Sequence, residues 1–215
     1  MVHHDPTIDR TTNGQGAIAH LSLATLQSFD AGYQFAAADG SYPHRDRGIQ
    51  VPTLAALCAA CPDAPLNIEI KQDDPPIEAS VLAVLAAHGA RARTLLAAEH
   101  HHIMVRIRAA APDMPTSASA TEVAEFVRRV QEGALAGYRP PFVALQVPPA
   151  YMGVEIVTRD AVRVAHDLGV EVHVWTINER PEMERLLDLG VDALMTDFPA
   201  IGAELLGRPR RSGPR

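Results

Sequence analysis

From residue 66 onward, short apolar runs alternate with amphipathic segments of helical length, and this alternation constrains the fold more than any other feature. Strands that alternate with helices in sequence indicate parallel βαβ units. Thr158 and Asn178 are predicted to cap two of the helices, and Gly169 and Gly190 to end them. The chain is therefore predicted to be an α/β protein. Its predicted strands are residues 66–71, 93–98, 115–119, 141–148, 170–177 and 192–197.

The polar and aromatic residues of this region fall at the carboxyl ends of the predicted strands. They are Glu69, Lys71, Gln146, Trp175, Thr176 and Asp197. Catalytic groups lie at that end of the strands in (β/α)₈ barrels, which favours a closed barrel over an open doubly wound sheet. A closed barrel has eight strands, whereas we count six strand–helix units after residue 65. The sequence thus predicts a TIM-type barrel that lacks its first two strands.

Residues 7–65 do not have the pattern of a strand–helix unit, because they are rich in glycine, turn-forming and polar residues. Two short helices are predicted there, at residues 22–30 and 53–61. A long irregular segment within a compact domain is often functional, so we interpret it as an insertion at the mouth of the active site. Residues 1–206 are predicted to form one domain, and the basic residues 207–215 a disordered tail.

The net charge and hydropathy of the chain exclude some classes of partner. Its 215 residues carry a formal net charge of −7, and no nucleic-acid partner is expected because such proteins usually carry a basic patch. No apolar run approaches the roughly 20 residues of a membrane span. No signal peptide is visible either, so a cytoplasmic location is expected. The alternative is that a lost N-terminus carried a signal.

Two motifs invite a redox or metal interpretation. Cys58 and Cys61 have C-x-x-C spacing, but they lie on one side of an amphipathic stretch, which favours core packing. Two cysteines alone cannot form a tetrahedral zinc site. The run "EHHH" at residues 99–102 lacks the H-x-x-x-H spacing of a metal motif, and we interpret it as the start of a helix after a strand.

Several segments, in order, resemble the glycerophosphodiester phosphodiesterases. They extend from residue 2 to about residue 206 and include independent motifs with consistent spacing. The segments are "VHHDPTIDRTTNGQG", "LQSFDAGYQF", "VPTL", "LNIEIK", "VHVWTIN" and "GVDALMTDFP". A phosphodiesterase that acts on phosphoinositides is a rival within the same enzyme class, and the segment containing "DAGYQF" argues against it.

The resemblance implies a metal-dependent phosphoric diester hydrolase of lipid metabolism. It implies a (β/α)₈ barrel with an insertion after the second strand, which hydrolyses glycerophosphodiesters to glycerol 3-phosphate and an alcohol. One divalent cation, Mg²⁺ or Ca²⁺, and two histidines that act as acid and base belong to the family pattern. The H-R-G and E-x-D segments that open this pattern are absent from the sequence. We therefore expect an N-terminally truncated form with impaired activity, which self-associates through unpaired barrel edges; the alternative is a non-catalytic remnant that binds phosphate weakly.

The resemblance assigns His4 as a catalytic histidine, because His4 precedes Asp5 as the family's second catalytic histidine precedes its aspartate. A histidine can protonate a leaving alkoxide or take a proton from a nucleophile. The competing interpretations are an exposed terminal histidine and a catalytic role for His3 instead. Arg10 is expected to support its loop by hydrogen bonding.

Strand alternation places Asn67, Glu69 and Lys71 on one face of their predicted strand, and this face is the interior in a barrel. A buried carboxylate and ammonium are costly unless they are paired or bound to a ligand, so a structural ion pair is one interpretation. The resemblance instead implies that Glu69 is a metal ligand and that Lys71 contacts phosphate. It also suggests Trp175 as an apolar wall for the glycerol moiety, with core packing as the alternative.

Overall fold

A computed structural model describes residues 1–207, and the chain divides into two compact units. The first unit joins Met1–Pro65 to Gln72–Arg93, and the second joins Leu66–Lys71 to the residues from Thr94 onward. Apart from Gly207, the tail expected at residues 207–215 lies outside the described residues. Within residues 1–207, no helix combines the length and the apolar character that crossing a membrane requires.

The first unit consists of short helices joined by long irregular segments, as the sequence predicts. Ser22 and Thr53 cap the two predicted short helices by accepting hydrogen bonds from the backbone N–H groups of Thr25 and Ala56. The helices of this unit are η1 (Ile18–His20), α1 (Leu23–Ser28), α2 (Leu54–Ala60), α3 (Glu78–Ala87) and η2 (Arg91–Arg93).

Side chains hold the irregular segment of the first unit in place, through hydrogen bonds to its backbone and through contacts between Arg45 and two aromatic rings. The two carboxylate oxygens of Asp30 accept from the N–H groups of Gly32 and Asp46, each at 2.8 Å. The guanidinium of Arg45 lies 3.4 Å from the ring centroid of Tyr42 and 4.3 Å from that of Tyr33. These contacts give the segment a defined conformation without regular structure.

The cysteine pair packs as the sequence predicts, at least for its first member. Cys58 is buried within α2, while Cys61 is the half-buried residue that ends this helix, and both thiols are free. A buried free cysteine behaves as a small apolar residue.

The second unit is a run of parallel strands. The strands are β1 (Leu66–Glu69), β2 (Thr94–Ala97), β3 (Ala144–Val147), β6 (Glu171–Val174) and β7 (Ala193–Leu194). Residue 66 pairs with 94 between β1 and β2, 144 with 171 between β3 and β6, and 173 with 193 between β6 and β7, all in parallel. Thr116 bridges to Leu96 of β2, and Ser117 bridges to Ala144 of β3. All six predicted strand positions are therefore found, although the weak strand at 115–119 forms only these bridges.

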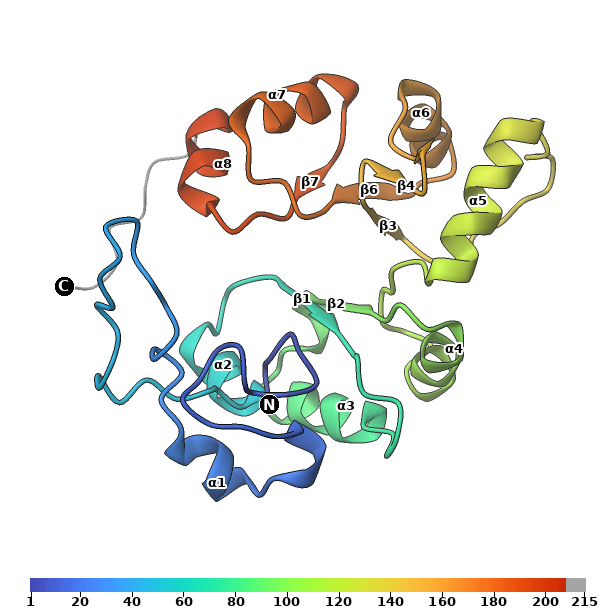
Figure 1. Ribbon diagram of the computed structural model, residues 1–215. Helices are drawn as coiled ribbons and strands as arrows, with labels where there is room; N and C mark the ends of the chain where they lie inside the picture. The colour runs from blue at the N-terminus through green and yellow to red at the C-terminus, as the bar shows by residue number, and fades with distance from the viewer. Residues whose placement is uncertain (208–215) are drawn as a thin grey trace. The chain divides into compact units, whose positions relative to one another are not determined.

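A helix follows each of these strand positions in the chain. The helices of the second unit are α4 (His101–Ala110), α5 (Ala120–Glu132), α6 (Arg159–Asp167), α7 (Arg180–Leu189) and α8 (Pro199–Leu205). Figure 1 shows α4 to α7 on one side of the strands. Phe126 of α5, Val162 of α6 and Met183 of α7 are buried in a core that also contains Val147 and Val172 from the strands. The amphipathic pattern of the sequence thus matches the buried faces of α5, α6 and α7.

The predicted helix ends are correct with one exception. The Thr158 side chain accepts from the N–H of Ala161 at 3.1 Å, and Gly169 and Gly190 follow their helices with positive φ. The prediction that Asn178 caps α7 is wrong, because Glu179 occupies the N-cap position and makes no side-chain capping bond. The amide of Asn178 instead bonds to the end of the neighbouring strand, as described below.

One element of the second unit was not predicted. After β3 the chain forms an antiparallel hairpin of two short strands, β4 (Ala150–Tyr151) and β5 (Val154–Glu155). Met152 and Gly153 form its turn, with φ of 49° and 81°. A glycine in a two-residue turn between apolar residues is a sequence signal for a hairpin, and the segment "AYMGVE" contains it.

Candidate active site

The carboxyl ends of the strands in the second unit carry the side chains that the sequence singled out. Because neighbouring parallel strands end at the same edge of a sheet, residues that follow β3, β6 and β7 lie at one edge. Trp175 follows β6 directly, and its backbone N–H donates to the backbone carbonyl of Val147 at the end of β3, at 3.1 Å. The peptide bond between Trp175 and Thr176 is cis.

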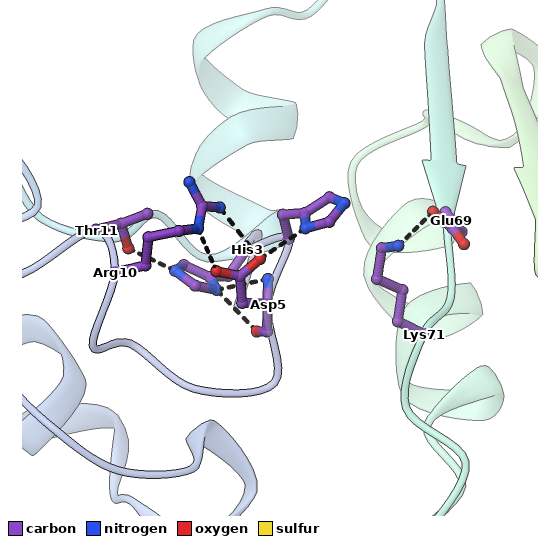
Figure 2. A network of polar contacts seen from close by, with 7 residues as sticks. His3, Asp5, Arg10, Thr11, Glu69 and Lys71 are labelled. Atoms are coloured by element: carbon purple, nitrogen blue, oxygen red, sulfur yellow. Dashed lines mark hydrogen bonds and ion pairs between the residues drawn. The ribbon is translucent and has the colours of Figure 1, made fainter. Parts of the chain in front are cut away.

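Glu69 and Lys71 form an ion pair at the end of β1 (Figure 2), with 2.9 Å between Lys71 Nζ and Glu69 Oε2. Ile70 between them is buried, and its N–H donates to the carbonyl of Ala97 on the next strand. The expected alternation is therefore present. The expectation of a buried pair is wrong, since the side chains of Glu69 and Lys71 are 37% and 40% exposed. Both groups are thus accessible to a ligand.

A single carboxylate at this position does not form a cation site. Mg²⁺ and Ca²⁺ require several oxygen ligands to offset dehydration. Within residues 1–207, no three His, Cys, Asp or Glu side chains are grouped so that they could hold a metal ion. The described residues therefore do not fit a divalent cation by themselves. The "EHHH" run opens α4 as predicted, and His101 Nδ1 lies 3.0 Å from Ser119 Oγ.

An amide bridge joins β1 to β3 on the face that carries Glu69. The side-chain amide of Gln146 donates to Asn67 Oδ1 at 3.0 Å, and Asn67 Nδ2 lies 3.9 Å from the sulfur of Met195, which follows β7. The neighbours of Gln146 on β3, Leu145 and Val147, belong to the helix-packed core. Gln146 and Asn67 therefore lie on the opposite face of the strands. The sequence places both amides on predicted strands, but strand spacing alone does not show that Asn67 of β1 and Gln146 of β3 meet.

Trp175 lies at the edge where the strands end and is 42% exposed. This exposure contradicts the core-packing interpretation and is compatible with a wall for a bound molecule. Behind it, Asn178 Nδ2 donates to Asp197 Oδ2 at 2.9 Å, and Asn178 Oδ1 accepts from the N–H of Asp197 at 2.9 Å. The Thr196 hydroxyl also donates to Asn178 Oδ1 at 3.1 Å. Asp197 thus supports the strand end.

In the first unit, the side chains of His4, Asp5 and Arg10 form a hydrogen-bonded chain. Arg10 Nε and one terminal nitrogen donate to the two Asp5 oxygens at 2.6 and 3.1 Å (Figure 2). His4 Nδ1 lies 2.7 Å from Asp5 Oδ1. Arg10 therefore supports this loop, as the sequence predicted.

The protonation state of Asp5 determines the tautomer of His4. Hydrogen bonds from Arg10 and then from His4 hold the pKa of the Asp5 carboxyl well below its ordinary value. An ionised carboxylate only accepts hydrogen bonds, so His4 Nδ1 carries the hydrogen. In the neutral ring Nε2 is then the basic nitrogen. His4 is 75% exposed, and its Nε2 has no hydrogen-bond partner within residues 1–207.

His3 differs from His4, because the chain engages both of its ring nitrogens. The N–H of Asp5 donates to His3 Nδ1 at 3.2 Å, and His3 Nε2 lies 2.7 Å from the Thr11 hydroxyl (Figure 2). His3 is half-buried and holds the loop together. Of the two histidines, only His4 presents a ring nitrogen that is open to a substrate.

Comparison with known proteins identifies relatives of the chain. Residues 1–201 match the model of the glycerophosphoryl diester phosphodiesterase family. A glycerophosphodiester phosphodiesterase of Bacillus subtilis is 28% identical over 93% of this chain and 69% of its own length.

Solved structures show the same fold. The glycerophosphoryl diester phosphodiesterase domain of a Mycobacterium tuberculosis protein superposes with a TM-score of 0.77 at 19% identity, over 96% of this chain and 82% of that one. A phosphodiesterase of Oleispira antarctica, in complex with the product sn-glycerol-3-phosphate, gives a TM-score of 0.70 at 22% identity, over 94% and 78%. The fold is therefore of the TIM-barrel type, as predicted.

Proposed function

The chain belongs to the glycerophosphoryl diester phosphodiesterase family, and we propose that it acts on glycerophosphodiesters, releasing glycerol 3-phosphate and an alcohol. The family match over residues 1–201 carries this proposal. The family is one of phosphoric diester hydrolases. The complex of the Oleispira antarctica relative with sn-glycerol-3-phosphate supports a small-molecule substrate.

In this proposal, His4 is one of the two groups that transfer protons. Hydrolysis forms a bond from a nucleophilic oxygen to phosphorus and breaks the bond from phosphorus to the alcohol oxygen. An alkoxide leaves poorly unless it is protonated, and a positioned acid or base contributes about 10²–10⁴-fold to the rate. The open Nε2 of His4 supports this role, because Asp5 and Arg10 fix the orientation of the ring.

Lys71 is proposed to contact the phosphate, and Trp175 to cover the glycerol moiety. The Lys71 ammonium has three donors, of which the ion pair with Glu69 occupies one. Glu69 is proposed as one ligand of a divalent cation, Mg²⁺ or Ca²⁺. Because the described residues do not fit such a cation alone, we expect the 215-residue chain to have low activity. A polypeptide that also carries the H-R-G and E-x-D segments is expected to be active.

The experiment measures release of glycerol 3-phosphate from glycerophosphocholine, with and without a chelator. The 215-residue chain is compared with a version extended at its N-terminus by H-R-G and E-x-D segments. In the extended version, His4→Ala and Glu69→Ala are expected to abolish turnover. His88→Ala is the matched control, since His88 is an exposed histidine at the end of α3, and it should leave turnover unchanged.

Three results would contradict this proposal in different ways. Rapid, chelator-sensitive turnover by the 215-residue chain would show that other residues carry the site. Turnover that survives His4→Ala would remove the proton-transfer role. An extended version that folds but releases no glycerol 3-phosphate would favour a non-catalytic phosphate-binding remnant, which equilibrium binding of glycerol 3-phosphate would then measure.

A further inference from the structure

A histidine at the edge of the second unit where its strands end has a fixed orientation and an open ring nitrogen. His101 is the first residue of α4, and its side chain is exposed. Its Nδ1 lies 3.0 Å from the hydroxyl oxygen of Ser119, which precedes α5 and is fully buried. His101 Nε2 has no hydrogen-bond partner among residues 1–207. This nitrogen is therefore accessible to a ligand.

The hydrogen bonds around Ser119 determine which nitrogen of His101 carries the hydrogen. Ser119 Oγ donates to Glu122 Oε2 at 3.0 Å, and this carboxylate is ionised in its bidentate pair with Arg108. A hydroxyl has one hydrogen, so Ser119 Oγ accepts from His101 Nδ1. In the neutral ring, Nε2 is then a hydrogen-bond acceptor.

The groups that hold His101 are themselves held by the backbone. A terminal nitrogen of Arg108 donates to the carbonyl of Ser117 at 3.1 Å. The N–H of Ala120 donates to the carbonyl of Glu99 at 2.9 Å, which joins the loop before α4 to the start of α5. A side chain that is already held in one orientation loses little rotamer freedom when it binds a ligand. His101 is therefore preorganised to accept a hydrogen bond.

The loop of His101 follows the strand next to the residues that are proposed to hold the phosphate. Glu69 of β1 pairs in register with Ala97 of β2, and the N–H of Ile70 donates to the carbonyl of Ala97 at 2.8 Å. Because parallel neighbours end at the same edge of a sheet, Lys71 and the loop after β2 leave the sheet at the same edge.

Trp175, which is proposed to cover the glycerol moiety, follows a more distant strand. It follows β6, and β3 and the bridged residues 116–117 lie between β6 and β2. The glycerol and the alcohol of a phosphodiester are bonded to phosphorus through different oxygens, so they extend from it in different directions. With the phosphate at the end of β1 and the glycerol at Trp175, the loop after β2 is neighbouring surface that is left for the alcohol.

We propose that His101 determines specificity for the alcohol moiety of the substrate: its Nε2 accepts a hydrogen bond from a hydroxyl group of that alcohol, and Ser119 is the positioning residue that orients the ring. This inference rests on the proposed function, since it concerns the same phosphodiester. The favoured substrates are then glycerophosphodiesters whose alcohol is a polyol such as glycerol. A choline moiety is disfavoured, because it has no hydrogen-bond donor.

The test follows the ring nitrogens of His101 by nitrogen-15 NMR in the 215-residue chain, at about pH 8, where an ordinary histidine is neutral. Glycerophosphoglycerol is the probe, and glycerophosphocholine is the matched ligand whose alcohol has no hydroxyl. The Nε2 signal, identified by its absence in His101→Asn, should shift with glycerophosphoglycerol and remain nearly unchanged with glycerophosphocholine. Glycerophosphoglycerol should bind about two- to tenfold more tightly, which is what one hydrogen bond contributes.

His101→Asn separates binding from folding, because the asparagine amide donates as Nδ1 does but has no counterpart of Nε2. This variant should remain folded and lose the preference for glycerophosphoglycerol. In Ser119→Ala, part of His101 should change to the tautomer with its hydrogen on Nε2, which the same spectrum reports, and the preference should weaken. His88→Asn is the matched control, since His88 is an exposed histidine at the end of α3, and it should keep the preference.

Since this readout needs no turnover, it distinguishes failure of the inference from failure of the proposed function. An Nε2 signal that does not respond to glycerophosphoglycerol would overturn the inference, whether or not the extended version releases glycerol 3-phosphate. An equal response to inorganic phosphate would replace it with a phosphate contact. Tighter binding of glycerophosphocholine would also overturn it, and would assign the loop to a cationic alcohol that the exposed Glu99 attracts.

Discussion

The pair formed by Arg108 and Glu122 gives the sharpest test of the energetics of the second unit. Their side chains are 21% and 8% exposed, and two guanidinium nitrogens of Arg108 donate to the two Glu122 oxygens at 2.5 and 3.1 Å. Glu122 Oε2 also accepts from the N–H and the hydroxyl of Ser119, at 2.8 and 3.0 Å, which closes the capping box of α5. One carboxylate therefore satisfies four donors.

Glu122→Ala is expected to lower the free energy of unfolding by about 3–5 kcal/mol, because it leaves a largely buried guanidinium without its counter-charge. It also leaves the N-cap N–H of Ser119 without its acceptor. Glu122→Gln keeps the shape and one acceptor, so its expected cost is about 1–3 kcal/mol. Since a domain is stable by only about 5–15 kcal/mol, the alanine variant should be close to unfolding.

The assay is equilibrium unfolding in urea, followed by circular dichroism at pH 7. Glu132→Ala is the matched control on the same helix, because Glu132 forms an exposed pair with Arg128. Such pairs contribute about 0.3–0.5 kcal/mol. The free energies of unfolding of Glu122→Ala and Glu132→Ala are then compared. A difference of less than about 0.5 kcal/mol, which is what an exposed pair contributes, would refute the reasoning about burial.

The pH dependence provides a second check of the same pair. Burial alone raises the pKa of Glu122, but hydrogen bonds from Arg108 and Ser119 outweigh it, so the folded-state pKa lies below the ordinary value of 4.5. A carboxyl with a lowered pKa stabilises the fold above its unfolded-state pKa, and this contribution is lost as the pH falls through the folded-state pKa. The difference in unfolding free energy between the unsubstituted chain and Glu122→Gln should therefore be constant from about pH 7 to 5 and shrink below about pH 4.5. A difference that grows on acidification would reverse the assigned sign.

Two further outcomes are expected. Asn178→Ala removes three hydrogen bonds between the end of β6 and Thr196–Asp197, so the free energy of unfolding, measured by thermal unfolding, should fall by about 1–3 kcal/mol. Asn178→Asp should also destabilise the fold, because it places a carboxylate against Asp197. An unchanged melting temperature in both variants would contradict this account. β1 and β7 each pair with one named strand within residues 1–207. Because open strand edges pair with other chains, the 215-residue chain should form oligomers, which gel filtration with light scattering would detect. A monomer at all concentrations would count against that expectation.

The sequence by itself determined the order and type of the elements in the second unit, apart from the β4–β5 hairpin. Apolar runs such as residues 66–71, and helix signals such as Thr158 and Gly169, act over a few residues, so their outcome depends little on the rest of the chain. The motifs around Asp5 and Trp175 likewise gave the family, which the match over residues 1–201 confirms. The roles of His4, Glu69, Lys71 and Trp175 in the reaction remain proposals.

Only the tertiary structure decided which groups are accessible and which side chains meet. Asn178 has the sequence signature of a helix cap, yet its amide bonds to Asp197, because the neighbouring strand end offers three partners at once. Burial is likewise a property of the packed chain: Glu69 and Lys71 are accessible although strand alternation alone suggested a buried pair. His3 and His4 are adjacent and identical in type, and only the fold of their loop, through Thr11 and Asp5, engages one ring fully and leaves Nε2 of the other open.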